Sequence, residues 1–201
     1  MAIVAPYLPH EKLRVVADEF LGKHHPSGEL PVPIERIVEF KLGLDIVPVP
    51  GLKNQYDVDA FLTSDSTQIR VDGFIQAKHD SRYRFSLAHE VAHYLVHQDV
   101  FKQLKFSSIK EYKEVILAIP QEEYQWIEYQ AYALGGLILV PIKPLSDLFE
   151  TKTAEAKKAG VDLQTIDERA RKIVESNMGR YFGVSAEVIK RRMKKEKMWQ
   201  C

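Results

Sequence analysis

The chain has 201 residues, in which 28 Lys and Arg are balanced by 28 Asp and Glu, so its formal net charge is zero. A hydrophobic share of 45% excludes a disordered chain, and zero net charge argues against a general polyanion-binding protein. The single cysteine, Cys201, excludes a disulfide framework and a cysteine-based metal cluster. A chain of this length predicts one domain, or one domain with a helical appendage.

No targeting segment is predicted. Residues 1–9 lack a basic region and contain two prolines, which does not match a signal peptide. The apolar run over 131–142 is shorter than the roughly 20 residues that a membrane-spanning helix needs. We therefore expect a cytoplasmic protein without a membrane partner.

The first part of the chain mixes helices with short strands. Hydrophobic periodicity and turn residues predict two helices and then three strands, over 10–23, 33–42, 44–49, 59–63 and 68–71. Prolines in and after the first strand mark it as an edge strand, and a turn at 64–66 joins the other two. Gly43 is expected to end the second helix.

The rest of the chain reads as helices. They are predicted over 82–97, 108–119, 120–140, 144–159, 163–182 and 185–198. Helices, a few strands and then helices indicate an α+β fold, mostly helical, with a small three-stranded sheet and a C-terminal helical segment.

The pattern His89-Glu90-x-x-His93 lies on one of these predicted helices. Histidines four residues apart project from one helical face, so both imidazoles can reach one Zn²⁺ at about 2.0–2.1 Å. Glu90 lies about 100° around the helix, where a general base can meet a water without binding the ion. With seven histidines in the chain, the pattern arises by chance roughly 0.02 times. The alternative is a surface helix that carries two histidines.

A hydrolytic zinc site needs a third protein ligand. The metzincin pattern would require a histidine where this chain has Asp99, so that class is excluded. His97 is one turn beyond His93, but three ligands on one straight helix cannot surround one ion, so we interpret it as a residue that supports a ligand or ends the helix. Glu128 is the better candidate, because small residues three and seven positions later let its helix approach closely. The alternative is a solvent-facing glutamate.

Two motifs resemble those of the ImmA/IrrE family of metallo-endopeptidases. Residues 84–97, from Arg-Phe-Ser-Leu-Ala-His-Glu to Val-His, resemble the first motif, and residues 128–141, from Glu-Tyr-Gln-Ala to Val-Pro, resemble the second. The chain departs from the family where Val91 and Ala92 replace Leu-Gly or Phe-Gly. Tyr132 replaces an asparagine, and a leucine two residues later replaces a phenylalanine.

The resemblance covers residues 30–141 well and 142–201 loosely. It implies a zincin-like metallopeptidase domain over 1–143 and a C-terminal helical extension over 144–201, with the alternative that the extension packs on the same core. It also implies the site residues: the metal ligands His89, His93 and Glu128, with Glu90 as the base. Zn²⁺ is the expected cofactor, although Mn²⁺ or Fe²⁺ suits the same ligands. Family members cut helix-turn-helix repressors and thereby relieve repression of stress or mobile-element genes, so a repressor is the expected substrate.

Two supporting functions are needed, and the sequence leaves each open. A donor should stabilise the oxyanion that develops during hydrolysis, and the candidates are Arg84, Tyr94, His97 and Tyr132. Each neutral imidazole should find an acceptor for its other ring nitrogen, and the candidates are Asp72, Asp80 and Asp99.

Residues 186–197 hold six basic and two acidic side chains and follow a turn and a cap at Ser185. This is typical of a helix-turn-helix module, which would contact DNA or an acidic face of a repressor. The alternative is a solvated helix that docks Val188, Ile189 and Met193 on the core. We favour the second interpretation and do not expect a nucleic acid partner.

Two other classes compete with a peptidase. One is a non-catalytic regulator with a peptidase-like fold that binds a repressor or DNA, and the other is a metal-sensing module. Loss of function in Glu90→Gln with the metal retained would favour catalysis, whereas chelation that alters partner affinity without cleavage would favour sensing.

Overall fold

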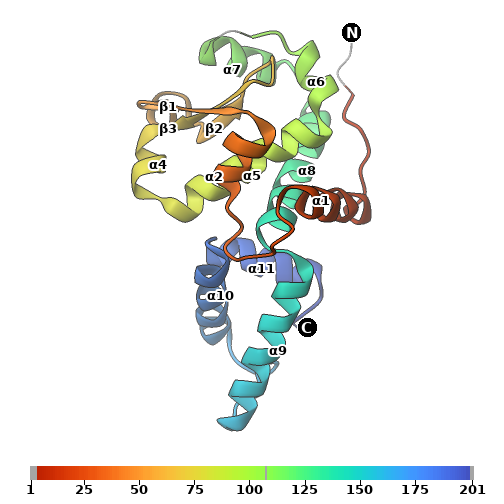
Figure 1. Cartoon of the computed structure of the whole chain (residues 1–201), viewed down its shortest axis with the longest axis vertical. Helices are drawn as coiled ribbons and strands as arrows, with labels where there is room; N and C mark the ends of the chain where they lie inside the picture. The colour runs from red at the N-terminus through yellow and green to blue at the C-terminus, as the bar shows by residue number, and fades with distance from the viewer. Residues whose placement is uncertain (1–3, 107, 200–201) are drawn as a thin grey trace.

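The computed structural model describes residues 4–106 and 108–199 (Figure 1), so Cys201 lies outside the described residues. Its elements are α1 (His10–His24), α2 (Ile34–Ile37), the π-helical turn η1 (Val38–Leu42), β1 (Asp45–Val49), α3 (Leu52–Tyr56), β2 (Ala60–Leu62), β3 (Gln68–Asp72), α4 (Gly73–Lys78), α5 (Asp80–Val96), α6 (Gln98–Gln103), α7 (Ile109–Leu117), α8 (Gln121–Leu139), α9 (Ile142–Lys158), α10 (Glu168–Phe182) and α11 (Ala186–Lys195). The predicted α+β class is confirmed, with many helices and a single small sheet in this part of the chain.

The sheet has the order β1-β3-β2, with β1 parallel and β2 antiparallel to β3. Pro48 lies on β1, where an edge strand tolerates a residue without an N–H. The antiparallel pair is joined by a turn in which the Asp65 carboxylate accepts the Thr67 amide at 3.1 Å. β2 is the other edge, and it lies against α5.

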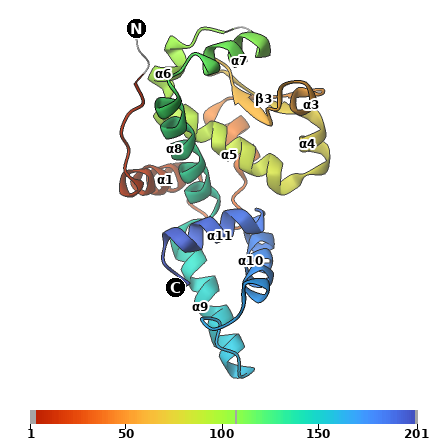
Figure 2. The same ribbon diagram turned by 180° about the vertical axis from the view of Figure 1, so that it is seen from behind.

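Helices α5 and α8 form the centre of the molecule and lie side by side (Figures 1 and 2). The sheet covers one side of α5, and α1 packs on α8. Both central helices bury apolar side chains: Leu87 and Val91 of α5 and Leu134 and Ile138 of α8 are each 0% exposed. The candidate metal site therefore sits on two rigid, buried helices.

The C-terminal helices extend from the lower end of α8 (Figure 1). Val188, Ile189 and Met193 of α11 are buried, as expected for a helix docked on the core. Arg84 of α5 also ties this segment to the rest, because its guanidinium donates to the carbonyls of Gly183 and Val32 at 3.1 and 2.7 Å. The division of the chain at 143/144 stays a prediction.

Several predicted elements differ in detail. The helix predicted over 33–42 is α-helical only to Ile37 and continues as η1, which ends at Gly43 with φ 68°. The helix predicted from 163 begins at Glu168, because the Asp167 carboxylate caps its N-terminus by accepting the Ala170 amide. Three short helices were not predicted: α3, α4 and α6. They are five or six residues long, and periodicity gives little signal over that length.

Among the described residues, no single helix has the length and apolarity that a membrane crossing requires. Helices α8 and α9 meet that requirement only when taken together, with a bend of 63° between them.

Candidate metal centre

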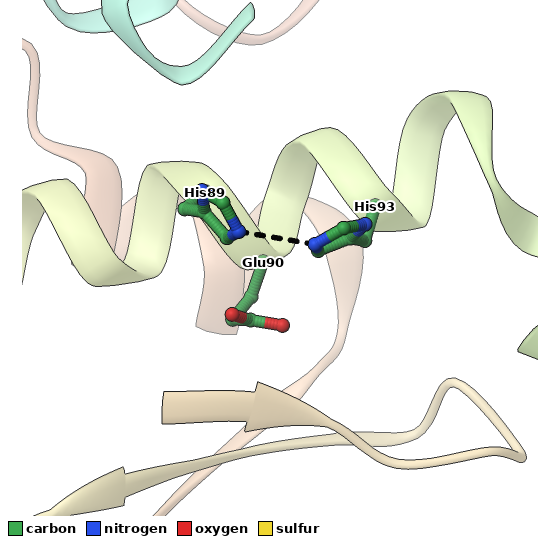
Figure 3. Close-up of side chains that lie close together, drawn as sticks. All are labelled: His89, Glu90 and His93. Carbon is green, nitrogen blue, oxygen red and sulfur yellow. Dashed lines mark hydrogen bonds between the residues drawn. The ribbon is translucent and has the colours of Figure 1, made fainter. Parts of the chain in front are cut away.

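His89 and His93 lie one turn apart on α5 and point toward one another (Figure 3). Their Nε2 atoms are 3.1 Å apart. The helix holds them there because its opposite face is buried in the core, including Leu87 and Val91 at 0% exposure. His93 is buried, whereas His89 is partly open to solvent. The pair is therefore anchored in the core at His93 and accessible to solvent at His89.

Glu128 on α8 completes a set of three converging side chains. Its Oε2 lies 3.3 Å from His89 Nε2, and its Oε1 lies 3.5 Å from His93 Nε2. Donor atoms held about 2.0–2.1 Å from one tetrahedral ion lie roughly 3.3 Å from each other. The three separations match that spacing, and two imidazoles with one carboxylate suit Zn²⁺. The residues therefore fit a divalent ion.

Glu128 reaches the histidines because α8 approaches α5 closely at Gly135. A Cβ atom at this glycine would lie 3.2 Å from the backbone C and O of Ala88 and from the N of His89. Such contacts are tighter than packed atoms normally allow, so a larger residue would push the helices apart. The small residue expected to permit this approach is thus found at the crossing itself.

Glu90 points away from the Nε2 pair, toward β2 (Figure 3). Its Oε2 accepts the backbone amide of Leu62 at 2.8 Å, and the residue is 5% exposed. His89, Glu90 and His93 also form a group whose ligand atoms lie within 4.8 Å of one another and could hold a metal ion. Burial raises the pKa of Glu90, although the two histidines oppose that shift.

The electrostatics of the site couple the Glu128 carboxylate to the two histidines. Burial alone would raise the pKa of Glu128, but its contacts with His89 and His93 hold it well below the usual range. Burial alone would lower the pKa of His89, but the carboxylates of Glu128 and Glu90 outweigh this effect and raise it. A divalent ion bound by the same three residues would likewise favour the ionised form of Glu128.

A chain of hydrogen bonds runs from His93 to the N-terminal segment. His93 Nδ1 lies 3.0 Å from His97 Nδ1, and His97 Nε2 lies 3.1 Å from Gln130 Oε1. The Gln130 amide nitrogen donates to the Pro6 carbonyl at 2.7 Å. A carbonyl can only accept, so Pro6 orients the amide and turns Oε1 toward His97.

This orientation determines the tautomers. His97 must donate from Nε2, and burial together with His93 lowers its pKa to about 3, so the ring is neutral and its Nδ1 is an acceptor. His93 must then donate from Nδ1, which leaves its Nε2 lone pair free to face Glu128 and His89. His97 and Gln130 thus support a candidate ligand, and His97 ends α5 as its C-cap.

The three aspartates considered as imidazole acceptors serve elsewhere, so that expectation was wrong. Asp72 accepts the amides of Lys53, Phe74 and Ile75 and caps α4. Asp80 is exposed at the first residue of α5. Asp99 is exposed on α6, with Lys102 3.7 Å away. The acceptor for His93 is another histidine, which spacing alone does not indicate.

The predicted oxyanion donors are divided by the structure. Tyr132 lies with His89 and Glu128 in one groove, and its ring packs on Phe85 at 4.7 Å. His97 lies behind His93, with both ring nitrogens engaged. Tyr94 packs against the hydrophobic core. Arg84 donates from Nε and Nη2 to backbone carbonyls away from the site. Of the four, only Tyr132 lines the groove that holds the candidate ligands.

Two tyrosines that the sequence analysis missed line the cleft beside the site. Tyr112 of α7 and Tyr124 of α8 face a cleft of about 260 Å³ that also contains His89, Glu90 and Glu128. Burial raises the pKa of Tyr112 well above its ordinary value, and burial raises that of Tyr124 to about 12, with Glu90 and Glu128 adding to both shifts. Both phenols are therefore protonated donors near neutral pH. No motif spacing indicated them.

Comparisons with known proteins agree with this geometry. The family model for Peptidase M78, described as the IrrE N-terminal-like domain, matches residues 54–194. No curated protein matches the chain significantly. Among solved structures, a Mycobacterium tuberculosis transcriptional regulator is similar, with 14% identity and a TM-score of 0.51, over 91% of this chain and 46% of that one. This likeness concerns the fold, and the chain spans about half the length of that relative.

Proposed function

Because the chain belongs to the Peptidase M78 family, with its IrrE N-terminal-like domain, we propose that it is a zinc-dependent endopeptidase. One observation carries the proposal: the Glu128 carboxylate reaches both Nε2 atoms, at 3.3 and 3.5 Å, from a separate helix. Glu90 stands beside this set with its carboxylate bound to β2. We assign His89, His93 and Glu128 as metal ligands and Glu90 as the general base.

The ion, when bound, supplies a Lewis acid that polarises the scissile carbonyl and makes a water more acidic. Leu62 holds Oε2 of Glu90, and the other oxygen is left to accept a proton from the attacking water. Glu90 then passes this proton to the leaving amine. Burial raises the pKa of Glu90, which makes its carboxylate a better proton acceptor.

We propose Tyr112 and Tyr124 as donors to the developing oxyanion, in addition to Tyr132. The first two line the same cleft as Glu90 and Glu128, and both keep their phenolic proton near neutral pH. Tyr112 is held in place by Phe61, whose ring stacks on it at 4.9 Å. A donor that is positioned before the reaction needs no reorganisation when charge develops.

The proposed substrate is a protein, and a helix-turn-helix repressor is the proposed class, acting in the cytoplasm. The cleft is lined by Asp57, Val58 and Ala60 at the start of β2, an edge strand of the sheet, where an extended peptide can lie against a strand. The resemblance to ImmA/IrrE peptidases supports a repressor, and the similar solved structure is named a transcriptional regulator. Cleavage would relieve repression. The helices of residues 144–201 are proposed as an extension of the catalytic part.

A non-catalytic regulator with the same fold is the second candidate. The similarity covers 46% of the solved regulator, so in that protein this fold is one part of a longer chain. In that case the metal site would shape a binding surface, and no peptide bond would be cut.

The deciding experiment compares Glu90→Gln, Glu128→Ala and the parent chain, purified without chelator or nickel affinity. Elemental analysis should find about one metal per chain in the parent and in Glu90→Gln, but sharply less in Glu128→Ala. Of these three chains, only the parent should cleave a repressor. Glu122→Ala, at the exposed first turn of α8, is the matched control and should keep both properties. Metal retained by Glu128→Ala would contradict the ligand assignment, and unchanged function in Glu90→Gln would contradict catalysis.

A further inference from the structure

A groove of about 870 Å³ leads from the metal site along α8 to α11. His89 and Glu128 lie in it at one side, and α11 crosses the lower end of α8 at the other (Figures 1 and 2). Gly136 forms part of its wall, and a Cβ there would lie 3.4 Å from the Cδ of Arg192. The groove is therefore continuous with the proposed catalytic centre.

The α11 side of this groove is basic. The exposed cations that line it are Arg191, Lys194, Lys195 and Lys197, and the buried Arg192 lines it as well. Among the described residues that line it, Glu128 is the one acid. No ion pair joins Lys194 or Lys197 to another described residue. Glu128 faces the histidines, and Arg191 is paired with Glu187 at 2.7 Å, so the uncompensated positive charge on the α11 side is that of the lysines.

Neighbouring groups hold this charge in place. Arg191 stacks over the ring of Tyr132, with its Cζ 4.6 Å from the centroid, and Lys195 donates to the Tyr129 hydroxyl at 3.3 Å. The nearby acid Glu196 is already bound by Arg192 and Arg14, at 2.6 and 2.9 Å. It is therefore not available to neutralise the lysines.

The structure divides the basic run of the sequence into two parts. Arg192 is 5% exposed and donates to the Val140 carbonyl and to Glu196, so it serves packing. The exposed cations Arg191, Lys194, Lys195 and Lys197 line the groove, and Lys194 and Lys197 also border a second pocket formed by α10 and α11. Of the two pockets, Arg191 and Lys195 border only the groove.

We propose that this groove binds an acidic stretch of the polypeptide substrate, and that Lys194, Lys195 and Lys197 recognise it. The proposal rests on the proposed function, because the acidic stretch would lie near the bond to be cut. Tyrosines along the groove offer apolar faces and hydroxyl groups to the same peptide; they are Tyr124, Tyr129 and Tyr132. Opposite charges steer such a peptide to the site and select against basic ones.

DNA fits this surface less well. A recognition helix places its N-terminal residues against the bases, but α11 begins with Ala186 and the acidic Glu187. The helix also lies between the α5–α8 pair and helices α9 and α10, rather than projecting from the molecule (Figures 1 and 2).

The test measures binding in the Glu90→Gln background, so that cleavage does not interfere. The probe is a short fluorescein-labelled peptide rich in Asp and Glu, and anisotropy reports binding. Its counterpart has Asn and Gln in place of the acids, and a short labelled DNA duplex is the third probe. Lys194→Glu/Lys195→Glu is compared with Lys157→Glu/Lys158→Glu. The second pair is the matched control, since both pairs are exposed neighbours in the last turn of a helix.

We expect the acidic peptide to bind more tightly than its amide counterpart. Its affinity should fall as the salt concentration rises. The 194/195 reversal should reduce this affinity roughly 10- to 100-fold, and the 157/158 reversal should not change it. If the first reversal fails to fold, Lys194→Gln/Lys195→Gln should show the same loss to a smaller degree. Equal affinity of both reversals for the peptide would overturn the proposal. Binding of the duplex but not the peptide, lost in the 194/195 reversal, would overturn it in favour of DNA.

The two proposals fail separately. Acidic-peptide binding that depends on Lys194 and Lys195, with no cleavage by the metal-loaded parent chain, would contradict the peptidase and leave a binding groove. Cleavage by the parent chain without any preference for acidic peptides would contradict the groove and leave the peptidase.

Discussion

Gln130 and His97 are joined by a hydrogen bond of 3.1 Å that sets the chemistry of a third residue, His93. Because the Gln130 amide nitrogen is committed to the Pro6 carbonyl, its oxygen must face His97. That contact makes His97 an acceptor toward His93 and leaves His93 Nε2 unprotonated. A carbonyl in the N-terminal segment thereby prepares a histidine on α5 to bind a metal.

Gln130→Met tests this relationship. The side chain keeps a similar volume but loses the acceptor, so His93 no longer has a preferred tautomer. Zinc affinity should fall about 10- to 100-fold, and nitrogen chemical shifts of His93 in the metal-free protein should show mixed tautomers. Gln121→Met, at the exposed start of the same helix, should change neither. Unchanged shifts together with unchanged zinc affinity in Gln130→Met would refute the role.

Gly135→Ala should separate α5 from α8. The added Cβ would meet the backbone of Ala88 and His89 at 3.2 Å, and backbone atoms cannot turn aside. We expect a loss of about 1–3 kcal/mol in the free energy of unfolding, with weaker zinc binding because Glu128 moves away. Gly22→Ala in α1, where no atom lies within 4 Å, is the control and should be neutral or stabilising. Urea denaturation and zinc titration would measure both effects, and equal results for the two variants would exclude the close-approach argument.

Arg84→Met should lower stability without affecting the metal. The arginine connects the carbonyls of Val32 and Gly183, which lie in separate parts of the chain. Losing these hydrogen bonds should cost about 2 kcal/mol in the free energy of unfolding. Zinc affinity should stay as in the parent chain, because the guanidinium does not reach the histidines. A large drop in zinc affinity with little loss of stability would instead indicate that Arg84 acts at the metal site.

Tyr112→Phe and Tyr124→Phe test the proposed oxyanion donors. Each change keeps the ring and removes one hydroxyl, so packing and zinc affinity should be preserved. If either phenol stabilises the transition state, kcat should fall about 10²- to 10³-fold in that variant while KM changes little. Tyr7→Phe, in an exposed aromatic pair with Trp126, should leave kcat unchanged. Full kcat in both cleft variants would leave Tyr132 as the remaining donor in the groove.

Stability should depend on pH through Asp72. Burial alone would raise the pKa of this carboxyl, but the amides of Lys53, Ile75 and Phe74 hold it below the ordinary value of 3.8. A group whose pKa is lowered on folding stabilises the native state above its unfolded pKa, and this contribution disappears as pH falls through the folded pKa. Its stabilisation is therefore complete above about pH 4 and is lost in more acidic solution.

Asp72→Ala should accordingly cost about 1–2 kcal/mol in the free energy of unfolding at neutral pH. The difference from the parent chain should shrink below pH 3.8. Metal-free protein is needed, because protonated histidines release the ion as pH falls. Asp72→Asn keeps a hydrogen-bond acceptor, so its loss in the free energy of unfolding should be smaller and should not depend on pH in this way. A difference between Asp72→Ala and the parent that is the same at neutral and acid pH would contradict the argument.

The sequence by itself determined the local part of the candidate site. A helix with an apolar face brings His89 and His93 to one side at a spacing of four residues, because helical geometry acts over one turn. The same geometry turns Glu90 away from them. Capping residues also predicted helix ends correctly, as at Ser108 and Ser185, since a cap acts within three residues.

Only the tertiary structure decided what meets these residues. Small residues suggested that α8 could approach α5, but the distance from Glu128 to the histidines follows from how the two helices pack. The contact between Gln130 and Pro6 spans 124 positions of sequence, and Leu62 reaches Glu90 across 28. Periodicity carries information over a few turns, whereas such contacts depend on the packing of the whole core. The acceptor for His93, the cleft tyrosines and the inward turn of Arg192 therefore became visible only in the folded chain.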